Sequence, residues 1–146
     1  MKQTYQYSAV GLAITKSFEG LRLTAYQDVA GVWTIGYGST IPTVHPGEVI
    51  TEKEAEQRLI DNMQTAVSCV SEAVTITITQ GQFDAMVDFC FNVGQGNFRN
   101  STLLRRVNAG DFAGAAAQFL VWVYAGGVVQ EGLDRRRRAE AEMFAA

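Results

Sequence analysis

Residues 18–38 read FEGLRLTAYQDVAGVWTIGYG, and within this stretch the pattern of apolar residues changes from helical to strand-like. The segment 8–19 repeats apolar residues four apart, which predicts a short helix that ends before Gly20. Beyond Gly20, two β-prone runs at 23–26 and 32–35 are separated by a turn that contains glycine. This spacing is typical of a β-hairpin. The N-terminal part is therefore predicted to be a helix followed by a small sheet.

The remainder of the chain has a helical pattern. Thr51 and Glu54 form a capping box, which opens a helix over about 51–73 that is longer than the average globular helix. Shorter helical patterns follow at 80–93, 101–109, 111–123 and 132–144. We therefore expect an α+β, mainly helical fold, in which a long helix joins a small N-terminal lobe at about 20–50 to a larger helical lobe at about 74–146.

Composition and charge exclude several classes of protein. The 146 residues are 47% hydrophobic and carry a formal net charge of −3. These values favour one compact domain and argue against disorder and against a basic protein that binds nucleic acid. His45 is the single histidine, and Cys69 and Cys90 are far apart in the sequence. Neither a zinc site nor a histidine-dependent nucleophile is expected, and no metal or organic cofactor is implied.

Neither a secretory signal nor a membrane span is predicted. Residues 1–8 are polar and lack the basic start and apolar run of a signal peptide. The most hydrophobic stretch, 112–129, is borderline in length for a membrane helix and is broken by Gly126 and Gly127. It is predicted to be a buried helix followed by a turn.

The sign of the charge changes along the chain. Residues 51–72 carry a net charge of −3, whereas residues 99–138 carry +4 because seven arginines outnumber three acidic residues. Two interpretations remain open. These arginines form an ordinary solvated face, or they present a basic surface to an anionic polymer.

With metal sites and histidine-dependent nucleophiles excluded, catalysis by carboxyl groups is the chemistry that remains. Glu19 lies at the end of the first predicted helix, beside Phe18, and apolar neighbours favour the protonated carboxyl that a general acid needs. Asp28 ends the first strand, and the hairpin should bring it close to Thr34 on the returning strand. A carboxylic acid that faces a carboxylate and a hydroxyl is the arrangement that cleaves a glycosidic bond. The alternative is that Glu19 and Asp28 are ordinary capping and turn residues.

The run 18–38 resembles the active-site segment of the phage-type lysozymes, the endolysins of T-even and lambdoid phages. The resemblance covers nearly the whole chain and continues in blocks at 82–85, 91–94, 101–105, 108–111 and 122–127. It implies a lysozyme-like fold and hydrolysis of the bond between N-acetylmuramic acid and N-acetylglucosamine in bacterial peptidoglycan. Glu19 matches the family's proton donor, Asp28 its second carboxylate, and Thr34 the hydroxyl that helps to position water. Inversion and retention both stay open, since the separation of the carboxyl groups decides between them.

The resemblance also points to residues of the helical lobe. Phe91, Asn92 and Ser101 match positions along the family's cleft and are expected to contact sugars, with a core position as the equal alternative for Phe91. One arginine of Arg135–Arg138 is expected to point inward near the catalytic glutamate. The others are expected to face the anionic wall polymer.

The expected partners follow from the same resemblance and from the lack of a visible export segment. A single catalytic domain over 1–146, acting as a monomer, would be made in the host cytoplasm and reach the cell wall in the periplasm through a holin-type membrane pore. A lytic transglycosylase and a catalytically inactive peptidoglycan-binding module are the alternatives, and the presence of both Asp28 and Thr34 argues against them. Cys69 and Cys90 are either two buried thiols or partners in a disulfide formed after export.

Overall fold

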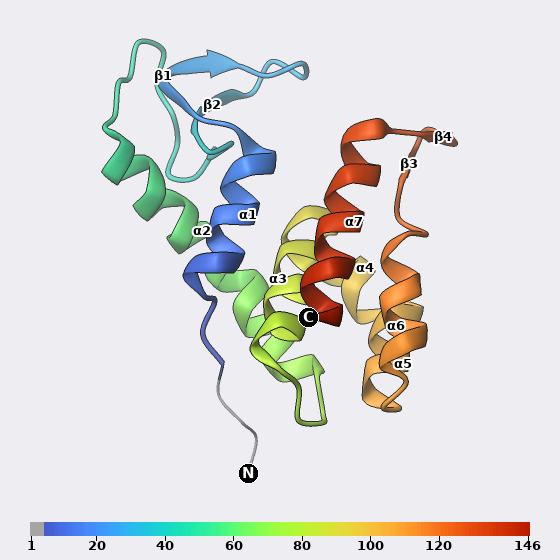
Figure 1. Cartoon of the computed structure of the whole chain (residues 1–146). Helices are drawn as coiled ribbons and strands as arrows, with labels where there is room; N and C mark the ends of the chain where they lie inside the picture. The colour runs from blue at the N-terminus through green and yellow to red at the C-terminus, as the bar shows by residue number, and fades with distance from the viewer. Residues whose placement is uncertain (1–4) are drawn as a thin grey trace. The chain divides into compact units, whose positions relative to one another are not determined.

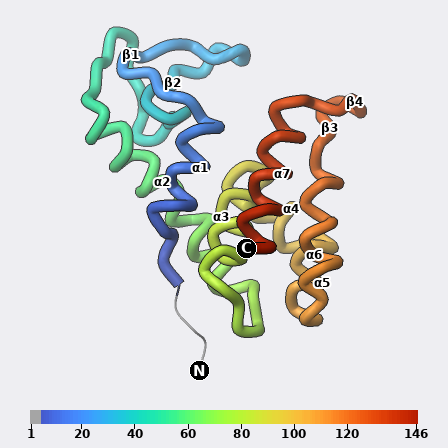
Figure 2. Tube along the Cα trace, in the orientation of Figure 1, coloured from blue at the N-terminus to red at the C-terminus, as the bar shows by residue number. Residues whose placement is uncertain are grey.

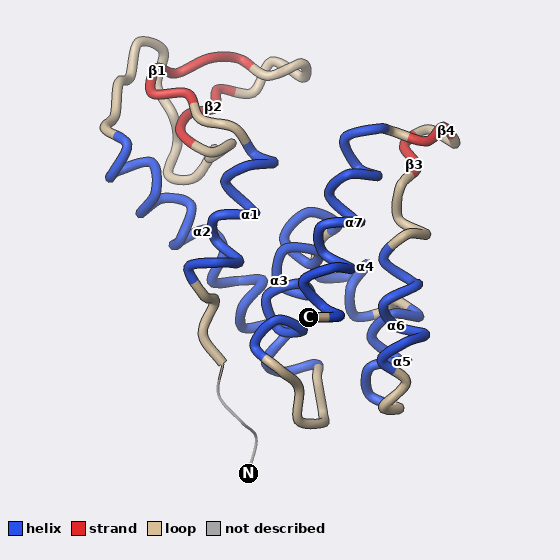
Figure 3. Tube along the Cα trace, viewed as in Figure 1, coloured by secondary structure: helices blue, strands red, loops and turns tan. Residues whose placement is uncertain are grey.

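The structure is a computed structural model that describes residues 5–146 (Figure 1). In chain order its elements are α1 (Ala9–Glu19), β1 (Arg22–Gln27), β2 (Trp33–Gly36), α2 (Glu52–Ala73), α3 (Gln80–Val93), α4 (Gln95–Arg99), α5 (Thr102–Asn108), α6 (Phe112–Phe119), β3 (Tyr124–Ala125), β4 (Val128–Val129) and α7 (Glu131–Ala145). The strands of the described chain form two small hairpins (Figure 3). The predicted α+β, mainly helical fold is confirmed. The polar stretch 1–8 lies partly outside the described residues.

The described chain forms two compact units. The hairpin unit spans Leu12–Gln64, and the helical unit contains residues 5–11 together with Thr65–Ala146. Both boundaries between the units fall inside helices, because α1 and α2 each contribute residues to both. None of the helices in residues 5–146 is both long enough and apolar enough to cross a membrane.

The hairpin unit contains β1, β2 and the first part of α2. The two strands pair antiparallel, with Tyr26 opposite Thr34. The buried cluster of this unit consists of Ile35, Val44, Ile50 and Ala55. Trp33 and Tyr37 are half-buried and pack against this cluster. Because Ala55 belongs to α2, apolar burial attaches the hairpin to that helix.

The predicted starts of α1 and α2 are confirmed by their caps. The backbone N–H of Gly11 donates to Ser8 Oγ at 3.2 Å. At α2, the N–H of Glu54 donates to Thr51 Oγ1 at 3.1 Å, and the N–H of Thr51 donates to Glu54 Oε1 at 3.3 Å. These bonds satisfy N–H groups for which the first helical turn has no acceptor, so the local sequence defines where each helix begins.

The helical unit is centred on α3. Residues 82–90 of this helix are all buried. Helix α7 packs against α3, and α5 lies beside α6 (Figure 2). Phe89 makes edge-on contacts with Phe98, Phe119 and Trp122, at ring-centroid distances of 6.3, 5.5 and 5.5 Å. These aromatic contacts join α3 to α4, to α6 and to the segment that follows α6.

The structure differs from the prediction in two segments of the helical unit. The helix expected over 111–123 ends at Phe119, and the chain then forms the β3–β4 hairpin around Gly126 and Gly127. Both glycines have positive φ, +60° and +78°, which suits a tight two-residue hairpin turn. The prediction of a buried helix followed by a turn over 112–129 is therefore wrong in part, since only Ala115 and Phe119 of α6 are buried. Helix α4 was not predicted, because five residues are too few to show a periodic pattern.

Candidate active site

Glu19 is the last residue of α1. The helix ends there because Gly20 adopts a left-handed conformation, with φ +71°, while its N–H donates to the carbonyl of Lys16 at 3.1 Å. The Glu19 side chain is half-buried. Its Oε2 atom lies 3.2 Å from the point where a Cβ on Gly38 would stand. The carboxyl of α1 therefore lies against the backbone just beyond β2.

Asp28 organises the turn between β1 and β2. Its Oδ1 accepts from the N–H groups of Ala30 at 2.8 Å and Val32 at 2.9 Å. Its own N–H donates to the carbonyl of Val32, and its carbonyl accepts from the N–H of Gly31, both at 2.9 Å. Residues 5–146 show no hydrogen bond to the second carboxylate oxygen, Oδ2, and the residue is exposed. One oxygen thus holds the turn while the other faces solvent.

Thr34 is buried on β2, with 4% of its surface exposed. Its hydroxyl donates to the carbonyl of Val32 at 2.9 Å, which is the same oxygen that accepts from the N–H of Asp28. The hairpin therefore brings Asp28 and Thr34 together at one backbone carbonyl, as the sequence pattern predicts. Because the Thr34 hydroxyl donates its proton inward, its lone pairs remain as acceptors.

This arrangement suits acid-assisted attack by water. The carboxylate of Asp28 and the hydroxyl oxygen of Thr34 are acceptors, and a water molecule can donate one hydrogen to each. Glu19 supplies a second carboxyl from a different element of the same unit. A general acid and a water-positioning pair are the groups that glycoside hydrolysis requires.

Two glycines of the hairpin unit are positioning residues that the sequence analysis did not identify. Gly36 and Gly38 both have positive φ, +67° and +78°. A Cβ on Gly36 would lie 3.2 Å from the Cβ of Ala55, and one on Gly38 would lie 3.2 Å from Glu19 Oε2. The alternation Thr34-x-Gly-x-Gly was visible as a motif, but only the structure shows what each glycine faces.

The three residues expected to contact sugars belong to the helical unit, and they differ from one another in how exposed their side chains are. Phe91 is half-buried and Asn92 is exposed, both near the end of α3. Ser101 is buried, and its hydroxyl caps α5, donating to the carbonyl of Phe98 at 2.7 Å and accepting from the N–H of Leu104 at 3.1 Å. The hydroxyl of Ser101 is thus already engaged in a helix cap, whereas Asn92 remains accessible.

The arginine run also differs from the expectation of one inward side chain. Arg136 and Arg137 are both buried, whereas Arg135 and Arg138 are exposed. Arg136 makes a bidentate pair with Asp88 of α3, with both donor–acceptor distances 2.9 Å. Two consecutive arginines are buried because each has a buried carboxylate partner, Asp88 for Arg136 and Glu140 for Arg137.

Cys69 of α2 and Cys90 of α3 are neighbours in the helical unit. Both are free and buried, each with 1% of its surface exposed. Burial, together with the adjacent Cys69, raises the pKa of the Cys90 thiol to about 12. The Cys90 thiol therefore stays protonated at neutral pH.

The described residues contain no group of three or more His, Cys, Asp or Glu side chains that could hold a metal ion.

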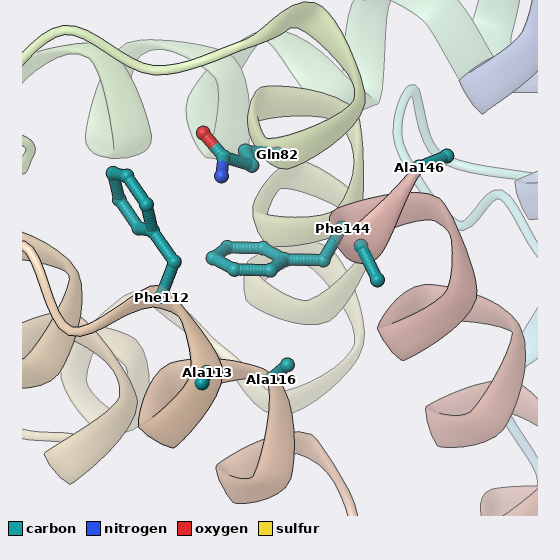
Figure 4. Close-up of a pocket in the computed structure, with 7 residues that line it drawn as sticks. Gln82, Phe112, Ala113, Ala116, Phe144 and Ala146 are labelled. Carbon is teal, nitrogen blue, oxygen red and sulfur yellow. The ribbon is translucent and has the colours of Figure 1, made fainter.

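A shallow hollow of about 210 Å³ lies in the helical unit, between the start of α3, α6 and the end of α7 (Figure 4). Phe112, Ala116 and Phe144 line it, and Gln82 is its polar side chain. The amide oxygen of Gln82 already accepts from the N–H of Thr79. The hollow therefore offers packing surface and no reactive group.

Comparison with known protein structures supports the fold. The structure of an endolysin from Escherichia coli O157:H7 phage FAHEc1 matches 99% of this chain and 96% of its own, with a TM-score of 0.93 and 38% identity. The muramidase domain of SpmX from Asticaccaulis excentricus matches 97% of this chain and 99% of its own, with a TM-score of 0.91 and 38% identity. The fold is therefore that of the lysozyme-like muramidases and endolysins.

The family is shown by the sequence as well. Residues 16–140 match the phage lysozyme family, and the endolysin of Bacillus phage B103 is 46% identical over 139 residues, or 94% of this chain. The chain belongs to the phage lysozyme family. It spans about half the length of the Bacillus phage relatives, 53% of the B103 protein and 55% of the PZA protein.

Proposed function

We propose that this protein is an endolysin that hydrolyses the β-glycosidic bond between N-acetylmuramic acid and N-acetylglucosamine in bacterial peptidoglycan. The observation that carries the proposal is the hairpin unit, in which Asp28 and Thr34 share the carbonyl of Val32 and Glu19 lies against Gly38. Membership of the phage lysozyme family supports the same substrate. In this proposal residues 1–146 act as one catalytic domain.

Each of the three residues has a distinct role. Glu19 protonates the glycosidic oxygen as the leaving group departs. Asp28, through Oδ2, and Thr34, through its hydroxyl lone pairs, orient a water molecule for attack on the sugar carbon. Oδ1 of Asp28 stays bound to the turn during the reaction, so the carboxylate is held in one orientation. Direct attack by this water would invert the configuration of the sugar carbon, whereas a retaining route would use Asp28 as the nucleophile.

The cellular setting is part of the proposal. The substrate is the cell wall, and its hydrolysis lyses the host cell. We propose that the protein acts as a monomer and reaches the periplasm through a holin-type pore.

The test compares wild type with Glu19→Gln on purified peptidoglycan, with products analysed by mass spectrometry. Wild type is expected to release fragments ending in reducing muramic acid, and Glu19→Gln is expected to release none while keeping its thermal unfolding midpoint. Glu142→Gln, which changes an exposed glutamate of α7, is the matched control and should be fully active. Anhydromuramic products would identify a lytic transglycosylase instead, and binding without products would identify an inactive binding module.

A further inference from the structure

Arg137 is a buried charged side chain in the interior of the helical unit. It lies on α7 and has 0% of its surface exposed. Burying a guanidinium costs much free energy unless nearby groups accept its hydrogen bonds. The groups that accept hydrogen bonds from Arg137 therefore indicate why this charged side chain is buried.

Three contacts fix the plane of the Arg137 guanidinium. Nε donates to the carbonyl of Trp122 at 3.1 Å, and Nη1 donates to Glu140 Oε1 at 2.5 Å. The guanidinium carbon lies over the ring of Phe89, 5.0 Å from its centroid. Such a fork is rigid, because its N–H groups lie in one plane and two of its three nitrogens are already bound.

The third nitrogen of the fork reaches Asn92. Nη2 of Arg137 donates to Asn92 Oδ1 near the end of α3. A guanidinium has only donors, so the carbonyl oxygen of the Asn92 amide must face it and the amide nitrogen must face away. Asn92 is exposed, and within residues 5–146 no acceptor binds its Nδ2. The buried Arg137 thus fixes the orientation of Asn92, so that the two N–H donors of Asn92 Nδ2 face the surface.

We propose that Arg137 is a positioning residue that holds Asn92 as a hydrogen-bond donor to the carbonyl oxygen of an acetamido group on the glycan. This inference rests on the proposed function, which makes an N-acetylated glycan the substrate. A fixed donor selects a carbonyl, which can only accept. A sugar hydroxyl can reverse its direction and would bind a donor or an acceptor equally.

The decisive variant is Asn92→Asp, which replaces the outward donor by an acceptor of the same shape. Its inner oxygen still accepts from Arg137, now as a carboxylate in an ion pair, so the unfolding free energy should be equal or higher. The measurement is calorimetric binding of soluble, uncross-linked peptidoglycan glycan chains to the full chain carrying Glu19→Gln, which prevents turnover. We expect affinity about tenfold weaker than with Asn92. Unchanged affinity would overturn the proposal.

A cycle of variants separates positioning from a structural role. Arg137→Lys keeps the charge but cannot hold three acceptors in a fork, so it should weaken glycan binding about as much as Asn92→Ala does. In the Asn92→Ala background, Arg137→Lys should have no further effect on binding, although its effect on stability persists. Equal losses of affinity in both backgrounds would mean that Arg137 acts on the fold and not on Asn92. If Arg137→Lys does not fold, Asn92→Asp alone decides.

The control is Arg138→Lys, which changes an exposed neighbour paired with Asp134 at 2.9 Å and should leave binding unchanged. In the active protein, Asn92→Asp should raise KM and leave kcat nearly unchanged.

The experiments distinguish failure of the proposed function from failure of the positioning role. If wild type releases no fragments and the Glu19→Gln protein binds no glycan, the proposed function and this inference both fall. If wild type releases fragments and Asn92→Asp binds normally, only the positioning role falls.

Discussion

Gly38 decides how closely the backbone beyond β2 can approach the carboxyl of Glu19. A Cβ at this position would stand 3.2 Å from Glu19 Oε2, and the φ of +78° disfavours any L side chain. Gly38→Ala should therefore cost about 1–2 kcal/mol in unfolding free energy. It should also displace the carboxyl of Glu19, the proposed general acid, and lower kcat roughly 10- to 100-fold. Denaturant unfolding and peptidoglycan turnover measure the two effects.

Gly47 provides the matched control for Gly38. It has a similar φ of +82°, but nothing lies within 4 Å of the position of its Cβ. Gly47→Ala should lose comparable stability and keep full activity. Equal activity of the two alanine variants would show that the contact between Gly38 and Glu19 has no catalytic consequence.

At the scale of elements, the contact of Cys69 with Cys90 links α2 to α3 within the helical unit. Burial raises the pKa of Cys90 from 9.0 to about 12, so the folded state holds the thiol proton more tightly than the unfolded chain does. The resulting stability is fully present below pH 9 and is lost as the pH rises towards 12. Unfolding free energies of wild type should thus fall more steeply than those of Cys90→Ala between pH 9 and 11. Parallel curves would contradict this.

Elements whose limits depend on local chemistry were predictable from the sequence. The caps at Ser8 and Thr51 and the turn after Asp28 are formed by residues within four positions of one another. The inward direction of both Arg136 and Arg137 was not predictable, because it depends on how α7 packs against α3. The role of Ser101 was missed for a different reason, since a serine before a helix is equally compatible with a cap and with an exposed contact.

At the scale of the whole molecule, the charges buried between α3 and α7 make stability depend on pH. Glu140 is fully buried, no donor within residues 5–146 binds its Oε2, and it faces Arg136, Arg137 and Asp88. Burial raises the pKa of Glu140 well above 4.5, and the Asp88 carboxylate raises it further, while Arg137 opposes both. The folded protein therefore favours the protonated carboxyl. This contribution is complete below pH 4.5 and is lost as the pH rises through the folded-state pKa.

Glu140→Gln tests this dependence. Glutamine can still accept from Arg137 but cannot ionise, so the variant should gain stability relative to wild type as the pH increases from 4.5. Urea unfolding across pH 4.5–8 measures the difference, with Glu142→Gln as the exposed control. A constant difference between wild type and Glu140→Gln would show that Glu140 does not titrate in this range.

The site combines what the sequence reveals with what only the fold reveals. Glu19, Asp28 and Thr34 could be proposed because residue type, spacing and family resemblance agreed on them. Gly38 and Arg137 could not be assigned roles, since each acts through a neighbour that is distant in the chain or on another helix. The roles of Gly38 and Arg137 depend on long-range packing, which no local sequence pattern predicts.

Val32 joins Asp28 to Thr34 through its main chain alone, and its side chain is 46% exposed. In evolutionary terms, most substitutions at position 32 change the side chain but keep the main-chain hydrogen bonds to Asp28 and Thr34. Proline is the exception, because it removes the N–H that binds Asp28. A conservation score would therefore rank Val32 low, although its peptide groups organise the pair beside it. Surveys that find active sites by invariant side chains overlook positions of this kind.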